Sequence, residues 1–136
     1  MAGKKKNKSI PLSGDILIDT FFEIFVEALE KTIESVRVKG ILRDPDDRRK
    51  ELHGLLVEGK IYLGKRKHRR KRSSFVGTLI HELLHVITDV EVVREVKVLK
   101  LEKIFSIRFT DAQKRYLRKY IPKHEVKREP PVASTG

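Results

Sequence analysis

Residues 78–86 of this chain read Thr-Leu-Ile-His-Glu-Leu-Leu-His-Val and contain the pattern H-E-x-x-H. Residues four apart lie on the same face of a helix, so the imidazoles of His81 and His85 can bind one metal ion. Glu82 lies about 100° round the helix from His81, where it can accept a proton from a metal-bound water. Apolar side chains fill the opposite side of the helical wheel. The pattern therefore predicts a helix with a buried apolar back and a metal-binding front.

A simpler interpretation is a pair of surface histidines on an amphipathic helix, because the five-residue pattern is short. We favour the metal site, since the apolar residues occupy only the back of the helix and further glutamates follow within two dozen residues. The 136-residue chain is long enough for one domain. It has no cysteine, so any metal must be bound by histidine and carboxylate side chains.

The net charge of +12 is unevenly distributed. Four lysines lie in residues 4–8 and seven basic residues lie in Lys65–Arg72, so the rest of the chain is nearly neutral. We predict a basic N-terminal tail and a basic loop. No stretch is long and apolar enough to cross a membrane, and we expect a cytoplasmic protein without a membrane partner.

The predicted fold class is α+β, with an N-terminal helix, a small three-stranded antiparallel sheet and three further helices. Ser13 or Asp15 is expected to cap the first helix, which runs to about residue 35. A turn is predicted at 44–47, from its Asp-Pro-Asp-Asp sequence. The predicted strands are residues 37–42, 52–58 and 60–64.

The metal-binding helix is predicted at about 74–88, with Ser73 or Ser74 as its cap. Two capping boxes, in residues 88–91 and 110–113, open helices expected at about 89–105 and 110–120. The domain boundaries follow from these elements. We expect a disordered tail at 1–12, a single domain at 13–121 and a flexible C-terminal tail at 122–136.

A catalytic zinc ion needs three protein ligands, and a glutamate after the H-E-x-x-H helix is the expected third. Glu91 belongs to a capping box, whereas Glu95 lies one turn later among apolar residues. We therefore predict Glu95 as the third ligand, with Glu91 as the alternative. Glu102 lies about 10 Å further along the helix and is expected to stay solvated or to have another role.

These segments resemble a known family. G-T-L-I-H-E-L-L-H-V at 77–86, the following Glu95 and the upstream strand L-V-E-G-K-I-Y-L-G at 56–64 are similar to the gluzincin metallopeptidases in very short form. They are also similar to the archaeal minigluzincins and to small phage-borne metallopeptidase domains. It covers about residues 52–105.

The resemblance implies a minimal zincin-like domain in which His81, His85 and Glu95 bind Zn²⁺ and Glu82 is the general base and acid. It also implies that Lys60, Ile61, Tyr62 and Leu63 form an edge strand that pairs with an extended peptide or protein substrate. Minigluzincins are further associated with latency, in which a C-terminal segment occupies the cleft.

The predicted function is zinc-dependent peptide hydrolysis, with the oxyanion donor left open among five residues: Tyr62, His68, Tyr116, Tyr120 and His124. His53 and His124 are otherwise expected to be ordinary surface histidines. One alternative is a nucleic-acid-associated protein that binds phosphates through Lys65–Arg72, although no aromatic residue is interleaved there for base stacking. Another is an inactive zincin scaffold. The sequence predicts no oligomeric state.

Overall fold

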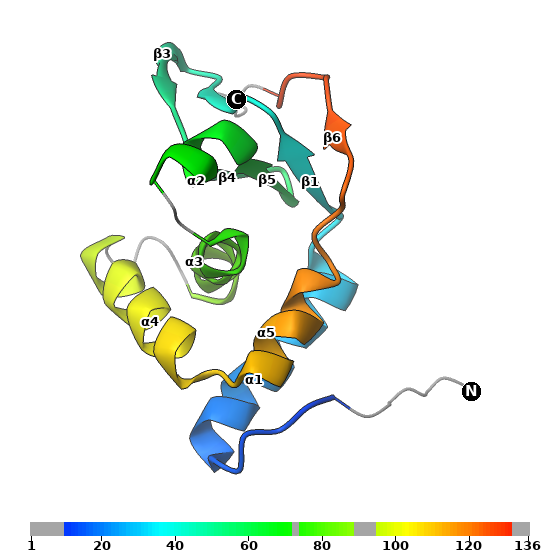
Figure 1. The fold of residues 1–136 in the computed structure, drawn as a ribbon, viewed down its shortest axis with the longest axis vertical. Coiled ribbons are helices and arrows are strands. Elements are labelled where there is room, and N and C mark those ends of the chain that lie inside the picture. Colours follow the sequence, from blue (N-terminus) through cyan, green and yellow to red (C-terminus); the bar gives the residue numbers. More distant parts are fainter. Residues whose placement is uncertain (1–9, 72–73, 89–94, 132–136) are drawn as a thin grey trace.

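The computed structural model describes residues 10–71, 74–88 and 95–131, which form five α-helices, a four-stranded mixed sheet and a two-stranded hairpin (Figure 1). The predicted α+β class is confirmed. In chain order the elements are α1 (Ile16–Glu27), a π-helical turn (Ala28–Thr32), β1 (Ser35–Lys39), β2 (Arg43–Asp44), β3 (Asp47–Glu51), β4 (Gly54–Val57), β5 (Lys60–Gly64), α2 (Lys65–Lys71), α3 (Phe75–Ile87), α4 (Glu95–Arg108), α5 (Asp111–Arg118) and β6 (Glu125–Val126).

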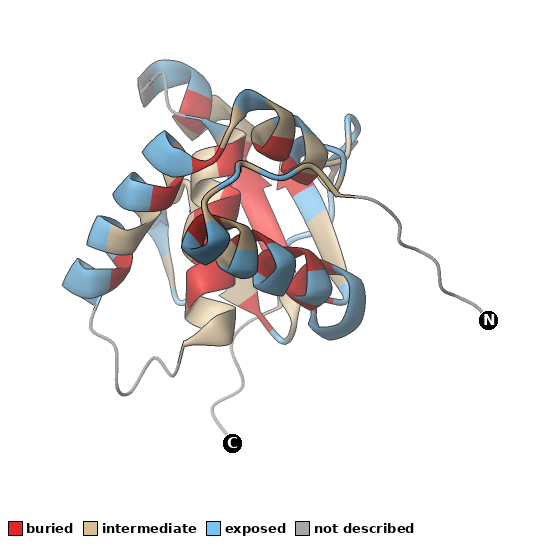
Figure 2. Cartoon of the chain, turned by 90° about the horizontal axis from the view of Figure 1, so that it is seen from below, coloured by how far each residue is buried: buried red, intermediate tan, exposed pale blue. Residues whose placement is uncertain are grey.

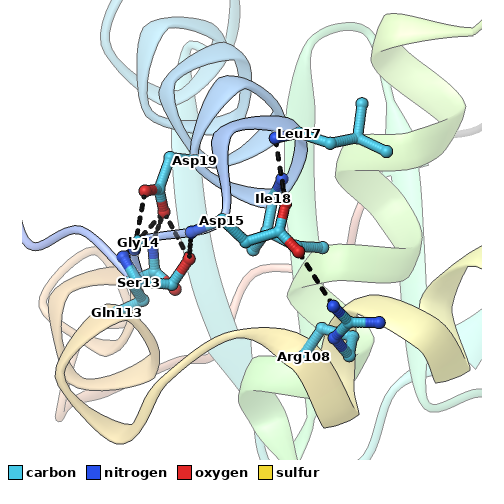
Figure 3. Close-up of polar contacts among 8 residues, drawn as sticks. All are labelled: Ser13, Gly14, Asp15, Leu17, Ile18, Asp19, Arg108 and Gln113. Atoms are coloured by element: carbon cyan, nitrogen blue, oxygen red, sulfur yellow. Dashed lines mark hydrogen bonds and ion pairs between the residues drawn. The ribbon is translucent and has the colours of Figure 1, made fainter.

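The start of α1 is fixed by two aspartates (Figure 3). Asp15 is the N-cap, and its carboxylate accepts hydrogen bonds from the first turn of the helix. Asp19 accepts hydrogen bonds from Ser13 and from Gln113 of α5, so it connects the segment before α1 to another helix. Burial opposes its ionisation, but these hydrogen bonds lower the pKa of Asp19 below its usual value. The predicted cap is confirmed.

The sheet has the order β4-β5-β1-β6, and β1 runs parallel to both β5 and β6. Only β4 and β5 pair antiparallel, across a turn at Glu58 and Gly59 that has positive φ angles at both residues. The predicted three-stranded antiparallel sheet is therefore wrong. The β2–β3 hairpin has its turn at the predicted position. The hairpin and β4 return the chain to the end of the sheet where β1 begins, so β5 runs beside β1 in the same direction.

The main core lies between one face of the sheet and the helices α1, α3, α4 and α5 (Figure 2). Ile61 and Leu63 of β5 point into it and are fully buried. Tyr62, between them, faces the other side, where it packs with Leu42 and Val57 in a second small cluster. No helix within the described residues is long and apolar enough to cross a membrane.

The basic segment predicted as a loop is a helix, α2, over residues 65–71. A buried histidine explains the difference. The Nδ1 of His68 lies 2.7 Å from the carbonyl oxygen of Gly64, and its Nε2 lies 2.7 Å from the hydroxyl of Thr78 in α3. Ion pairs from Arg66 to Glu51 and from Lys65 to Glu125 add contacts on the outer side. Residues 72–73 lie outside the described part of the chain.

The three later helices match their predictions in part. Ser74 caps α3, and the reciprocal capping box of Thr110 and Gln113 opens α5, as expected. The predicted capping box at 88–91 falls mainly on residues outside the described ranges. The helix that follows extends three residues beyond its predicted end, to Arg108, whose guanidinium pairs with Asp15 at 2.8 Å.

Parts of both predicted tails pack against the domain. Ile10 packs against the main core and the carbonyl of Pro11 accepts from Gln113, whereas residues 1–9 lie outside the described chain. In the predicted flexible C-terminal tail, β6 pairs with β1 at the sheet edge opposite β4. Glu129 also forms ion pairs with Lys39 and Arg48. Within residues 122–131, the segment predicted as a flexible tail therefore contains a strand that pairs with an edge of the sheet.

Truncation of the chain after Lys123 tests this role. Loss of β6 exposes the edge of β1 and removes the packing of Val126 on the second cluster, so we expect the free energy of unfolding to fall by about 1–3 kcal/mol. Urea denaturation followed by circular dichroism measures the change. An unchanged unfolding midpoint would show that β6 adds nothing to the domain.

Candidate metal centre

Three side chains from two helices converge at one point. The Nε2 atoms of His81 and His85 in α3 lie 3.2 Å apart. The carboxylate of Glu95, at the start of α4, places Oε2 at 3.1 Å from the Nε2 of His81 and Oε1 at 2.9 Å from that of His85. These residues form the one group of three or more candidate metal ligands in the described part of the chain. The predicted trio is brought together, and Glu91 lies outside the described residues.

The packing of α3 against α4 explains this convergence. The back of α3 is fully buried against the core, which leaves both histidines at the rim, with side chains 14% and 16% exposed. In α4, Val98 and Phe105 are the buried residues, seven apart and so on one face. Glu95 and Glu102 repeat the same seven-residue spacing beside them, so both carboxylates face α3.

The spacing of the donor atoms suits a tetrahedral ion. Bonds of about 2.0–2.1 Å at tetrahedral angles separate neighbouring ligand atoms by about 3.3 Å. The observed distances of 2.9–3.2 Å, in which each imidazole faces a different oxygen of the Glu95 carboxylate, are close to that value. Two neutral imidazoles and one carboxylate also form a donor set of the kind that zinc prefers in catalytic sites.

Glu102 contacts the imidazole of His81 at Nδ1, the ring nitrogen that does not face His85 and Glu95. Its Oε1 lies 2.9 Å from Nδ1 of His81, so Nδ1 carries the proton and the lone pair of Nε2 points to the convergence point. This hydrogen bond raises the pKa of His81, against an opposing effect of burial. Of the two expectations for Glu102, the structure agrees with the second, another role, because two helical turns separate it from Glu95 and return it to the same face.

A proton could take the place of the metal in this geometry. If Nε2 of His85 is protonated, it can donate to Glu95 or to His81 at the distances observed. The cluster would then be a hydrogen-bonded polar contact between α3 and α4. Zinc binding in solution distinguishes the two interpretations.

Glu82 lies beside the histidines and is 7% exposed. Burial raises the pKa of Glu82 to about 7; neighbouring His81 lowers it, whereas Glu95 and Glu102 raise it. The carboxyl opens into a hollow of about 350 Å³. The residues that line this hollow are His53, Gly54, Thr78, His81, Glu82, Glu95, Leu99 and Glu102.

Strand β4 lies against α3 at Gly54. A Cβ atom at this position would lie 2.5 Å from the side chain of Thr78 and 2.9 Å from Oε2 of Glu82. Only glycine therefore lets the strand come this close to the buried carboxyl. The expected edge strand, Lys60–Leu63, is wrong: β5 is paired on both sides, by β4 and by β1. The sheet edge next to the site belongs to β4.

None of the five residues considered as oxyanion donors lines the hollow. Tyr62 faces the other side of the sheet, and both ring nitrogens of His68 are hydrogen-bonded. Tyr120 donates to Glu30, away from the site. The sequence interpretation missed His53, which precedes β4 and does line the hollow. Its position depends on the packing of β4 against α3, which the sequence did not reveal.

The described part of the predicted C-terminal tail, residues 122–131, does not line the hollow, and β6 lies at the far edge of the sheet. This finding gives no support to latency through that segment. Comparison of the chain with protein-family models, with curated proteins and with solved structures found no match.

Replacement of Glu102 tests whether its hydrogen bond to His81 orients this imidazole for metal binding. In Glu102→Ala the imidazole loses the partner that fixes its tautomer, so we expect zinc affinity to fall by about 10- to 100-fold. Glu102→Gln keeps a hydrogen-bond acceptor and should recover part of that loss. Zinc affinity is measured by competition with a chromophoric chelator, with Glu27→Gln as a control at an exposed site. Equal affinity of Glu102→Ala and the parent protein would contradict the assignment.

His68 makes stability depend on pH. Burial lowers the pKa of His68 below its usual value of 6.5, so this imidazole binds a proton more readily in the unfolded chain than in the folded chain. Its contribution is present above about pH 6.5 and is lost as the pH falls.

We expect His68→Gln to cost about 1–3 kcal/mol at pH 7.5, because Gly64 and Thr78 lose a partner, and to cost less at pH 5. Urea unfolding at both pH values measures the difference, with the exposed His124→Gln as a control. A cost for His68→Gln that stays constant with pH would contradict burial of a neutral imidazole.

Proposed function

We propose that the chain is a zinc-dependent metallopeptidase of the minigluzincin type. The observation that carries the proposal is the convergence of three side chains beside a buried glutamate: the two imidazole Nε2 atoms lie 3.2 Å apart, and each lies 2.9 or 3.1 Å from a different oxygen of Glu95. His81, His85 and Glu95 would hold the zinc ion. When bound there, zinc supplies a Lewis acid that polarises a carbonyl and lowers the pKa of a water towards neutrality.

Glu82 is assigned the proton transfers. A carboxyl with a pKa of about 7 can both take and give a proton near neutral pH. It would accept the proton of the attacking water and pass it to the nitrogen of the leaving amine. The close contact with Gly54 of β4 keeps the carboxyl away from bulk solvent and fixes its position beside the cleft.

The free edge of β4 is the proposed substrate-binding strand, in place of β5. No strand among the described residues pairs with its outer edge, and its first residue lines the hollow that contains Glu82. An extended peptide could pair with this edge and present its carbonyl group to the site. The substrate class is therefore peptide or protein.

Nucleic-acid binding through Lys65–Arg72 is less well supported. Glu51 pairs with Arg66 and Arg70, and Glu125 pairs with Lys65, so part of the charge of α2 is already neutralised. An inactive scaffold is also disfavoured, because a scaffold does not need a buried carboxyl at Glu82. Burying a carboxyl without a cationic partner costs stability.

Two substitutions separate metal binding from catalysis. We expect His81→Ala to lose the zinc ion, which elemental analysis detects. We expect Glu82→Gln to keep about one zinc per chain and to reduce hydrolysis of unstructured protein substrates, such as casein, by at least about 10³-fold.

The exposed Glu34→Gln serves as a control for the loss of a carboxylate. Zinc bound without any cleavage by the parent protein would support the scaffold interpretation. Cleavage that persists in Glu82→Gln would show that another group transfers the proton.

A further inference from the structure

A second hollow lies on α4 next to the candidate metal centre. It is a groove of about 530 Å³ lined by Val96, Leu99, Lys100, Glu102, Lys103 and Ser106. Leu99 and Glu102 also line the hollow that contains Glu82, so the two hollows share a wall. The groove therefore continues the site along the helix.

The groove combines exposed apolar surface with positive charge. The side chains of Val96 and Leu99 are 56% and 48% exposed, although α4 already buries Val98 and Phe105 in the core. Lys100 and Lys103 are exposed and form no ion pair within the described ranges, 10–71, 74–88 and 95–131. Glu102, the one acid in the lining, already binds His81. The surface thus matches a ligand that is both apolar and acidic.

We propose that this groove is a specificity subsite for a peptide that carries an apolar residue next to an acidic one. The apolar side chain packs on Val96 and Leu99, and the carboxylate pairs with Lys100 and Lys103. The choice of a peptide as the ligand rests on the proposed function.

The dimensions of α4 set the position of this pair in the substrate. Leu99 lies one helical turn, about 6 Å, beyond the ligand Glu95, and Ser106 lies about 10 Å further. An extended peptide advances about 3.3 Å per residue. For a peptide that runs along α4 from the metal centre, the apolar residue would lie about two residues from the cleaved bond, with the acidic residue next to it on the far side.

Binding to the zinc-loaded Glu82→Gln variant tests the subsite without cleavage. Three fluorescent peptides share one sequence except at two adjacent positions, which are Leu-Asp, Leu-Lys or Ser-Asp. We expect the Leu-Asp peptide to bind about 5- to 10-fold more tightly than either of the others by fluorescence anisotropy at low salt. Equal affinity for Leu-Asp and either other peptide would overturn the proposal.

A charge reversal in the groove tests whether Lys103 pairs with the carboxylate of the peptide. Lys103→Glu, made in the same Glu82→Gln background, should reverse the preference to Leu-Lys. Lys97→Glu is the matched control, since Lys97 is an exposed lysine of the same helix that lines neither hollow. The control should keep the preference for Leu-Asp. The same loss in both variants would reveal a general charge effect and would overturn the subsite.

The cleavage assay on the parent protein separates this proposal from the proposed function. Selective binding of Leu-Asp without cleavage of any peptide would leave the subsite standing and reject the peptidase. Cleavage of all three peptides at equal rates, with equal affinities, would leave the peptidase standing and reject the subsite.

Discussion

The contact of α4 with α3 is the interaction on which the site depends. It brings the carboxylate of Glu95 within about 3 Å of two imidazoles from the other helix. The same contact places Glu102 behind His81, so one helix supplies both a candidate ligand and the group that orients another. A seven-residue repeat of apolar and acidic positions in α4 produces both contacts. The core packing of this helix and the geometry of the site are thus set by the same periodicity.

Strand β4 completes the site from the opposite side. Glycine at position 54 lets the strand lie against the carboxyl of Glu82, and burial there raises the pKa of Glu82 to about 7. Thr78, one turn before Glu82, touches the same glycine and also binds His68 of α2. The basic helix is therefore connected to the site through a buried histidine, and its main structural role is to hold α3 against the end of β5.

The sequence predicted those parts of the site that depend on local periodicity. H-E-x-x-H fixed the two histidines and Glu82 on one helix, and spacing alone selected Glu95 over Glu102 as the candidate third ligand. The role of Glu102 was missed because the contact needs the packing angle between two helices. The strand β6 and the edge position of β4 were also missed, since both depend on pairing with β1, far away in sequence. His53 was missed because its place depends on the packing of β4 against α3. His68 reads as one more polar residue in a basic run, and only tertiary burial reveals its role.

The central claim is that His81, His85 and Glu95 bind one zinc ion together. X-ray absorption spectroscopy of the zinc-loaded protein tests it most directly, because it reports the number and type of ligand atoms. The account predicts two imidazole nitrogens and light oxygen ligands at about 2.0–2.1 Å, with the Glu95→Ala variant changing the oxygen shell. A zinc ion surrounded only by oxygen atoms, or a spectrum that is the same in Glu95→Ala, would contradict it.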